Sequence, residues 1–238
     1  MKKFLTALLL FSLVTFMASA QNGETRFRLG LKAAPSFAWL KPDADGLSAG
    51  AVAMKFSYGL ITEFGIGKNY AFATGVDVSY VGGNLNFGKK VFEQTSAGDT
   101  FMLASRKYKL QYIEIPLTLK MKTNQIGYMT YFLQFGLNPS IRIKAKADDK
   151  DQAGVALNNV DISGDISLFR LALNVGIGAE YNIHGNTSLV FGITFNNGFT
   201  NVLTNPSNTI QKVSGGSATA YIQKATSNYL ALTVGVLF

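Results

Sequence analysis

Apolar and polar residues alternate with a period of two in eight stretches of this 238-residue chain. The stretches are 27–39, 52–64, 72–80, 113–121, 130–143, 169–181, 188–196 and 229–238. Successive side chains of a β-strand point to opposite faces of the sheet, so each stretch predicts one strand with an apolar face and a mixed face. The pattern therefore predicts an all-β fold.

The mixed face indicates how these strands are arranged. It is rich in Gly, Ala and Ser and also carries charged residues, whereas the other face consists almost entirely of large apolar side chains. Small residues fit the narrow interior of a closed barrel, and large apolar residues on its outside fit a lipid environment. We therefore expect an eight-stranded antiparallel transmembrane β-barrel of the outer-membrane type.

The connections between the stretches alternate between short and long. Residues 65–69, 122–125 and 183–186 have turn composition, whereas 82–107, 145–165 and 200–225 are long and polar, and 41–49 is intermediate. Bacterial outer-membrane barrels combine short periplasmic turns with longer extracellular loops. We interpret the long connections as outer loops.

The N-terminal residues have the composition of a secretory signal peptide. Lys2 and Lys3 precede an apolar stretch over residues 4–17, and Ala18 and Ala20 provide the small side chains of a cleavage site. We expect a signal peptide over residues 1–20 and a barrel domain over residues 21–238. An uncleaved N-terminal anchor is the alternative.

The last predicted strand ends on an aromatic residue. Leu232, Val234, Val236 and Phe238 share its apolar face. This ending resembles the insertion signal that the outer-membrane assembly machinery recognises. That machinery is therefore an expected partner, together with outer-membrane lipid and lipopolysaccharide. A buried last strand of a soluble sandwich is the alternative.

Composition narrows the possible chemistry. Only 15% of the residues are charged, below the roughly 25% of an ordinary soluble domain. The chain has no Cys, which excludes disulfides, thiolate catalysis and Cys-type zinc sites. The formal net charge is +8, but no run of Lys and Arg interleaved with aromatic residues forms a patch, so we expect no nucleic-acid partner. We also expect no cofactor.

Charged residues on the mixed face are the candidate lumen network. They are Arg28, Lys32, Lys55, Glu63, Asp77, Glu114, Lys120, Arg142, Arg170 and Glu180. An eight-stranded barrel is just wide enough for its own side chains, and buried charges persist there only when they are paired. We predict an ion-pair plug that stiffens the barrel. A narrow path for anions is the alternative, because bases outnumber acids.

The sequence offers little for catalysis. Its one histidine, His184, lies in a predicted short turn, and Ser188 is the serine nearest to it. A Ser–His nucleophile pair needs hydrogen-bond contact, so we expect no enzyme activity. The aspartates within 43–45 and 148–151 are too few for a Ca²⁺ site. We expect them to be solvated loop residues.

Pro116 falls inside a predicted strand, where proline removes a donor from the hydrogen-bond ladder. The apolar face also changes parity between Tyr112 and Ile113. One extra residue in a strand produces such a change, so we predict a β-bulge here.

Taken together, the mature chain resembles the PorT-like family of outer-membrane β-barrels. The most specific piece is Tyr112–Lys120 (YIEIPLTLK), which is similar to the family's fourth strand; Gly30–Lys32 (GLK) and Gly176–Tyr181 (GIGAEY) support it. The resemblance implies an outer-membrane location and an eight-stranded barrel. A link to protein secretion is expected only from the type IX secretion protein that gives the family its name.

Three functions remain as hypotheses. We favour a structural or assembly role in the cell envelope, with an envelope or secretion complex as partner. The alternatives are a narrow pore for small solutes and a surface protein whose outer loops bind a ligand or a host molecule.

Overall fold

The computed structural model describes residues 27–43, 47–94, 100–151, 154–204, 211–214, 217–220 and 224–238. The strands are β1 (Phe27–Pro42), β2 (Leu47–Ala49), β3 (Ala53–Gly67), β4 (Tyr70–Gln94), β5 (Thr100–Glu114), β6 (Leu117–Lys122), β7 (Met129–Asp151), β8 (Ala156–Asp161), β9 (Phe169–His184), β10 (Thr187–Gly198), β11 (Gln211–Ser214), β12 (Ser217–Ala220) and β13 (Ala225–Leu237), with one short 3₁₀ helix, η1 (Ser163–Asp165). No helix in these ranges is long and apolar enough to cross a membrane. The predicted signal peptide, including Ala18 and Ala20, lies outside the described residues.

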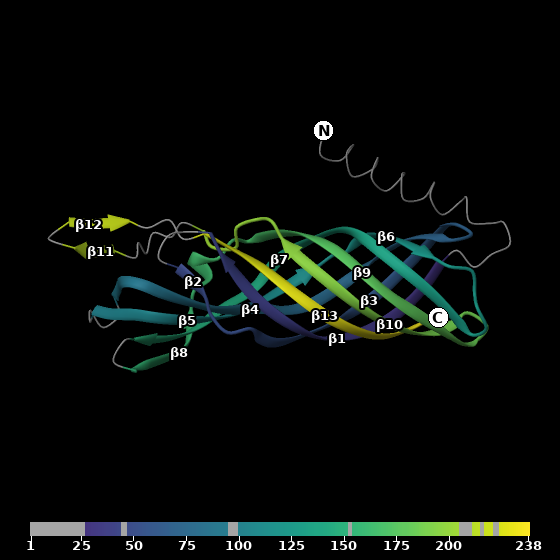
Figure 1. The fold of residues 1–238 in the computed structure, drawn as a ribbon, viewed down its shortest axis with the longest axis horizontal. Coiled ribbons are helices and arrows are strands. Elements are labelled where there is room, and N and C mark those ends of the chain that lie inside the picture. The colour runs from purple at the N-terminus through teal and green to yellow at the C-terminus, as the bar shows by residue number, and fades with distance from the viewer. Residues whose placement is uncertain are drawn as a thin grey trace, which may run out of the picture.

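The strands close into a barrel with eight antiparallel positions around its circumference (Figure 1). We call each position a stave, because one of them consists of two strands. β1 pairs with β3 on one side and with β13 on the other. The ring continues from β3 through β4, then β5 and β6 together, β7, β9 and β10, which pairs with β13. β5 and β6 form one stave that is interrupted at Pro116. The prediction of an eight-stranded antiparallel barrel is therefore confirmed.

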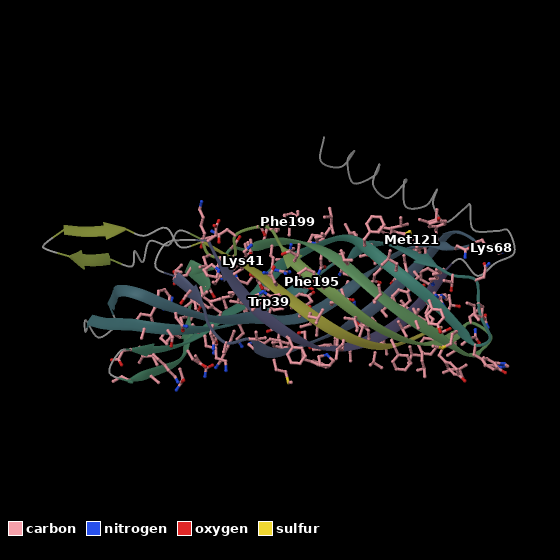
Figure 2. All side chains as sticks on the ribbon, viewed as in Figure 1. Trp39, Lys41, Lys68, Met121, Phe195 and Phe199 are labelled. Carbon is pink, nitrogen blue, oxygen red and sulfur yellow. The ribbon has the colours of Figure 1, made fainter. Side chains whose placement is uncertain are left out.

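Large apolar side chains cover the outside of the barrel, as a membrane-spanning barrel requires (Figure 2). On β1, Leu29, Leu31 and Phe37 are all exposed, and Leu230, Leu232 and Val234 continue this surface on β13. Trp39 stacks on Phe195 with ring centroids 6.1 Å apart. We call this surface the apolar band.

The two ends of the barrel wall meet between β1 and β13. Leu29 and Phe238 exchange two backbone hydrogen bonds, of 3.3 and 2.8 Å, at the end of this seam. Gly30 lies in the same seam, where a Cβ atom would come within 2.1 Å of the carbonyl oxygen of Val236. A side chain at position 30 would therefore push the closing strands apart.

The two ends of the barrel differ. At one end, short turns join β3 to β4, β6 to β7 and β9 to β10, and the C-terminus lies there as well (Figure 1). We call it the short-turn end. At the other end, which we call the extension end, β4, β5, β7 and β8 continue beyond the apolar band as hairpins.

The prediction that 82–107 and 145–165 are long polar loops is therefore wrong over most of their length. Strand β4 continues to Gln94, β5 begins at Thr100, and β7 continues to Asp151 before pairing with β8. The strands persist because their inward positions remain apolar: Leu85, Leu103 and Leu110 are almost completely buried. The sequence pattern concealed this because the outward positions become polar where the band ends.

A second core fills the extension end. β4 follows β3 only as far as the Ser57–Ser79 pair and then crosses to β1, where Gly83 packs directly against the backbone of Trp39 and Leu40. The buried cluster that results contains Ala34, Ala38, Leu40, Val81, Leu85, Phe87, Leu103, Tyr108, Leu110, Tyr112, Ala145, Ala147, Ile162, Ile166, Val202, Leu203, Ala225, Tyr229 and Ala231. We call it the outer apolar core. It resembles the interior of a soluble protein and blocks this end of the barrel.

The bulge predicted at Tyr112 is on the neighbouring strand. In β5, the alternation continues without a slip, with Tyr112 and Glu114 buried and Ile113 exposed. The register shift places Gln111 opposite Lys144 and Tyr112 opposite Arg142, so the extra residue is Ile143 of β7. The apolar pattern changes parity at Tyr112 because Tyr112 points inward, into the outer apolar core, whereas Ile113 points outward. At Pro116 the structure has a break between β5 and β6 where the sequence predicts a bulge.

A charge on the apolar band should destabilise the barrel strongly. Val234 is half exposed and lies near the middle of the apolar row of β13. We expect Val234→Arg to lower the free energy of unfolding by about 2–4 kcal/mol, because the guanidinium would face hydrocarbon near the bilayer midplane. Urea titration in liposomes measures the change. Val155→Arg, the same substitution at an exposed position of the extension end, is the control and should change stability by less than about 0.5 kcal/mol.

Candidate functional site: the charged interior of the barrel

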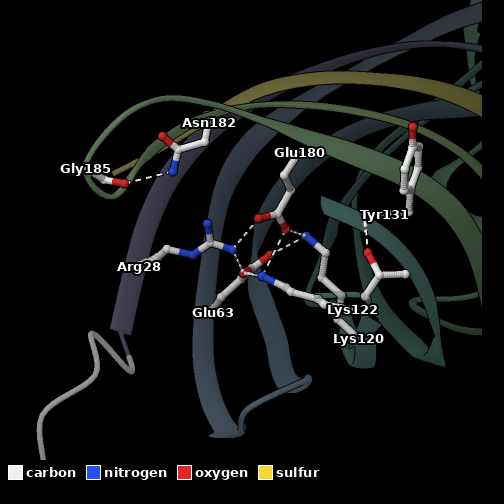
Figure 3. A network of polar contacts seen from close by, with 9 residues as sticks. Arg28, Glu63, Lys120, Lys122, Tyr131, Glu180, Asn182 and Gly185 are labelled. Carbon is white, nitrogen blue, oxygen red and sulfur yellow. Dashed lines mark hydrogen bonds and ion pairs between the residues drawn. The ribbon is translucent and has the colours of Figure 1, made fainter. Parts of the chain in front are cut away.

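Five charged side chains meet at the short-turn end of the lumen (Figure 3). Arg28 Nη2 lies 2.6 Å from Glu63 Oε2 and 2.6 Å from Glu180 Oε2. Lys120 binds Glu63 and lies 2.6 Å from Glu180, and Lys122 lies 2.5 Å from Glu63 and 2.9 Å from Glu180. Each carboxylate thus contacts all three cations. We call these five residues the inner charge network.

The strand pairing explains why these residues meet. Arg28 is directly opposite Glu63 in the β1–β3 register, whereas Glu180 comes from β9 and Lys120 from β6. Side chains from four staves therefore cross the lumen at one level. Glu63 and Lys120 are only 2% and 3% exposed, so each depends on its partners to offset the loss of hydration.

An aromatic ring supports this network from the extension side. The ring of Phe132 points into the lumen with Lys120 Nζ 3.9 Å from its centroid, a cation–π contact. It packs against backbone, because a Cβ atom at Gly178 would lie 2.4 Å from the ring and one at Gly192 would lie 3.5 Å from it. Val190 and Leu237 complete this small apolar layer.

Beyond Phe132 the lumen contains a small polar cavity of about 70 Å³. Lys32 and Asp77 line it and form an ion pair of 2.7 Å. Asn138 and Asn174 also line it, and each has a buried amide oxygen with no hydrogen-bond partner among the described residues. A cavity of this size and polarity accommodates only a few water molecules, which would satisfy these oxygens.

A second charged layer lies beside this cavity, next to Tyr229 of the outer apolar core, which also lines the cavity. Arg170 Nη1 lies 3.2 Å from Glu114 Oε1, and Arg170 also donates to Asn196 and to the carbonyl oxygen of Ser227, the latter at 2.9 Å. Glu114 Oε2 accepts hydrogen bonds from Tyr229 at 2.7 Å and Asn138 at 2.8 Å. We call this set the middle charge network. Both of its ions are 1% exposed, which indicates a fully packed cross-section.

The structure brings eight of the ten predicted lumen charges into these layers. Arg28, Glu63, Lys120 and Glu180 belong to the inner charge network, Glu114 and Arg170 to the middle one, and Lys32 and Asp77 to the cavity between them. Lys55 and Arg142 lie elsewhere. Lys55 is near Lys107 and Lys109 at the extension end, and Arg142 donates to the carbonyl oxygen of Ser163.

Sequence reasoning missed two interior residues. The composition of residues 122–125 predicts a turn, but Lys122 has the same parity as Lys120 and is the last residue of β6. Both neighbours of Phe132 are large and apolar, so the alternation does not mark it as an inward residue. The glycines opposite it, Gly178 and Gly192, were the available signal, because they leave room for a ring.

Ion pairs also hold the extension end together. Arg106 Nε lies 2.7 Å from Asp149 Oδ1, and both residues are almost completely buried. Asp165 of η1 lies 3.7 Å from Arg106. Burial raises the pKa of the Asp165 carboxyl, an effect that the charge of Arg106 opposes and that of Asp149 reinforces. These contacts tie η1 to the hairpins.

The short-turn end has an open mouth of about 590 Å³. Its floor is the inner charge network, and Lys68, Asn124 and Asn186 are among the polar residues of its rim. The mouth is therefore a vestibule that ends at the inner charge network.

The histidine and serine considered from the sequence do not form a pair in the structure. His184 is exposed at the end of β9, next to the β9–β10 turn, whereas Ser188 is buried and pairs with Asn182. No group of three or more His, Asp or Glu side chains in these ranges is suited to a metal ion.

The predicted insertion signal lies on β13 and at the residue after it. Leu232, Val234 and Phe238 are exposed on the apolar band, and Val236 is half-buried in the same row. Its recognition by an assembly machinery stays a prediction.

Comparison with known proteins identifies the family. The model of the outer membrane protein beta-barrel domain matches residues 19–203. The chain belongs to this family. Outer-membrane location follows from the family, so the apolar band faces lipid and the barrel lies in the environment of lipid and lipopolysaccharide. The chain matches no curated protein.

Several solved outer-membrane barrels are similar in structure to this chain. Neisserial surface protein A is 17% identical, with 91% of this chain and 98% of that chain covered and a TM-score of 0.45. A major outer membrane protein from Thermus thermophilus is 14% identical, with 89% and 99% covered and a TM-score of 0.45. The attachment invasion locus protein Ail of Yersinia pestis is 12% identical, with 90% and 100% covered and a TM-score of 0.38.

Removing one carboxylate should expose how much the inner charge network contributes to stability. We expect Glu63→Gln to lower the free energy of unfolding of the barrel by about 3–5 kcal/mol, because three cations would then share Glu180 alone. Urea titration in liposomes at neutral pH measures the change. Asp43→Asn makes the same chemical change at an exposed residue and should have almost no effect. Equal effects of the two variants would contradict a paired interior.

Proposed function

We propose that this protein is a non-conducting outer-membrane barrel with a structural or assembly role in the cell envelope. The observation that carries the proposal is the succession of packed layers in the lumen. The inner charge network, the Phe132 layer, the middle charge network and the outer apolar core follow one another, and the cavity among them has only about 70 Å³. A filled lumen supports a role in which the barrel contacts partners through its outer surfaces and does not conduct solutes.

We further propose the finer identity that the sequence suggests. The protein is exported through an N-terminal signal peptide cleaved after Ala20, and its short-turn end faces the periplasm of a Gram-negative cell. It is a PorT-like protein, and a link to protein secretion is proposed on the resemblance of Tyr112–Lys120 alone. Assembly into the membrane uses the C-terminal signal that ends at Phe238.

The closed lumen gives a direct electrical prediction. Purified full-length protein in planar bilayers should give no steady current steps above the noise at about 100 mV. The reason is that the charge networks and the outer apolar core fill the lumen in the described part of the chain. A general porin added to the same bilayers is the positive control. Steady, voltage-independent steps from the protein would favour the alternative of a narrow pore.

The vestibule at the short-turn end is the surface that we propose for an envelope partner. It is polar, opens toward the proposed periplasmic side and is rimmed by short turns that the barrel holds rigidly. A rigid polar rim suits contact with a folded periplasmic protein better than passage of a solute, because the vestibule ends at the inner charge network.

A surface-binding role is the second candidate, because the hairpins of the extension end form a folded unit of their own above the apolar band. Residues 205–223 separate the two roles. Their deletion leaves Val202, Leu203 and Ala225 of the outer apolar core in place.

In affinity purification from native envelopes in mild detergent, we expect a stoichiometric partner to be retained by the 205–223 deletion and lost on Lys68→Glu at the vestibule rim. The reverse pattern, with loss on loop deletion and retention on Lys68→Glu, would favour the surface-binding role.

We also propose that the protein is not an enzyme. The support is the geometry of its one histidine. His184 is exposed at the end of β9, and the side chain of Ser188 is buried on the opposite face of the hairpin.

A further inference from the structure

Lysine side chains from two separate strands converge at the extension end, just beyond the apolar band. Lys55 lies near the start of β3, and Lys107 and Lys109 lie in β5. Lys55 is close enough to both for their charges to repel one another, and Asp148 of β7 lies within electrostatic reach of all three. We call Lys55, Lys107 and Lys109 the lysine cluster.

The path of β4 explains this convergence. β4 leaves β3 beyond the Ser57–Ser79 pair and crosses to β1, and β5 follows β4, with Lys107 opposite Asn84. The inward positions of β5 are filled by Tyr108 and Leu110 of the outer apolar core. The lysines between them therefore face away from the core, on the side where the end of β3 lies.

The neighbouring strand adds further positive charge. In the β5–β7 register, Lys146 is directly opposite Lys109, and Lys144 is opposite Gln111. Like charges directly opposite each other destabilise a strand pair. Asp161 of β8 is directly opposite Lys146 on its other side and offsets part of this repulsion. An external anion would remove the electrostatic cost that is left.

Carboxylates in the described part of the chain neutralise the cluster only in part: Asp148 is directly opposite Lys107 in the β5–β7 register. Asp148 lies 2.6 Å from Lys109. Hydrogen bonds from Lys109 and from the backbone N–H of Asn159, together with the charges of Lys109 and Lys107, outweigh the partial burial of this carboxylate and lower its pKa. Asp148 is thus ionised and already engaged, and within the described part of the chain Lys55 and Lys107 form no ion pair.

The position of the cluster indicates what kind of anion it fits. Lys55 is flanked by Met54 and Phe56, which are 75% and 44% exposed on the apolar band. On the other side, the band ends at Ile113 of β5 and Ile143 of β7, four residues from Lys109 and one residue from Lys144. An anionic group bound here would be joined to an apolar part that lies along the band. That is the chemistry of a phosphorylated lipid.

We propose that the lysine cluster, with Lys144 and Lys146 beside it, binds the phosphate groups of lipid A in the outer leaflet. The acyl chains of the lipid lie against the apolar band next to Met54 and Ile143, and Asp148 limits the affinity by occupying Lys109. The site deepens the proposed envelope role and rests on the orientation given there, with the extension end outward.

The test uses the full-length chain in nanodiscs of zwitterionic lipid, with bis-phosphorylated lipid A titrated in and bound lipid counted by native mass spectrometry. Each charge near an anionic lipid surface changes affinity by roughly fivefold. We expect Lys107→Glu to weaken binding roughly 25-fold, because it changes the local charge by two units. Lys55→Gln should weaken it roughly fivefold. Lys68→Glu, the same reversal at the short-turn end, should change it less than twofold.

Asp148→Asn gives a result of the opposite sign, which misfolding would not produce. Removing the carboxylate that binds Lys109 should tighten lipid A binding roughly fivefold. Dephosphorylated lipid A should bind weakly to every variant, and inorganic phosphate at millimolar concentration should compete poorly.

Three outcomes would overturn the proposal. They are equal losses from Lys107→Glu and Lys68→Glu, binding that does not depend on the lipid phosphates, and full competition by inorganic phosphate, which would indicate a site for free anions. Because nanodisc binding needs neither a periplasmic partner nor a closed lumen, its failure would leave the proposed function to be judged by its own experiments.

Discussion

The closure of an eight-stranded sheet on itself is the constraint on which the rest of this structure depends. A barrel of this size has an interior only as wide as its own side chains. Every inward residue must therefore find its partner across the lumen, and any charge placed there must be matched by another. The inner and middle charge networks satisfy this requirement with side chains from four or more staves each, which locks the register of strands that are far apart in the sequence.

Two different kinds of packing close the two halves of the barrel. Toward the short turns the lumen is filled by ions, where Glu63 and Glu180 hold three cations between them. Toward the extensions it is filled by an apolar core, in which Leu85 and Leu103 are completely buried. The change between the two occurs at Tyr229, whose ring lies in the apolar core and whose hydroxyl donates to Glu114 of the middle charge network. A barrel whose lumen is filled in these two ways is suited to binding partners through its outer surfaces.

The sequence predicts the barrel well because a membrane-spanning strand needs an apolar residue at every second position. This period-two alternation is the strongest pattern in the chain. Every predicted strand corresponds to a stave, and most predicted lumen charges face one another. The prediction is wrong at the extension end, where the strands continue beyond the apolar band. Beyond the apolar band, outward positions become polar and inward positions become apolar. The hairpins that contain Leu85 and Leu110 therefore have the composition of loops. For the same reason, the apolar pattern changes parity at Tyr112 although the strand has no bulge there.

The partners of individual charges could not have been predicted either, because they depend on register across several strands. Parity places Arg28 and Glu180 on the inside, but the distance between their strands is 152 residues along the chain. Lys55 shows the same limitation. Its parity is that of a lumen residue, yet the departure of β4 from β3 leaves it beside Lys107 and Lys109, outside the two charge networks.

The most direct test of a packed interior is the reactivity of a thiol placed inside it. Because the chain has no native cysteine, Thr118→Cys introduces one reporter between the inner and middle charge networks, at a site that is 2% exposed. Lys68→Cys places another in an exposed turn. With a small charged thiol reagent added to membranes permeable from both sides, we predict rapid labelling at position 68 and almost none at position 118. Equal labelling at the two positions would show a water-filled lumen and contradict the account.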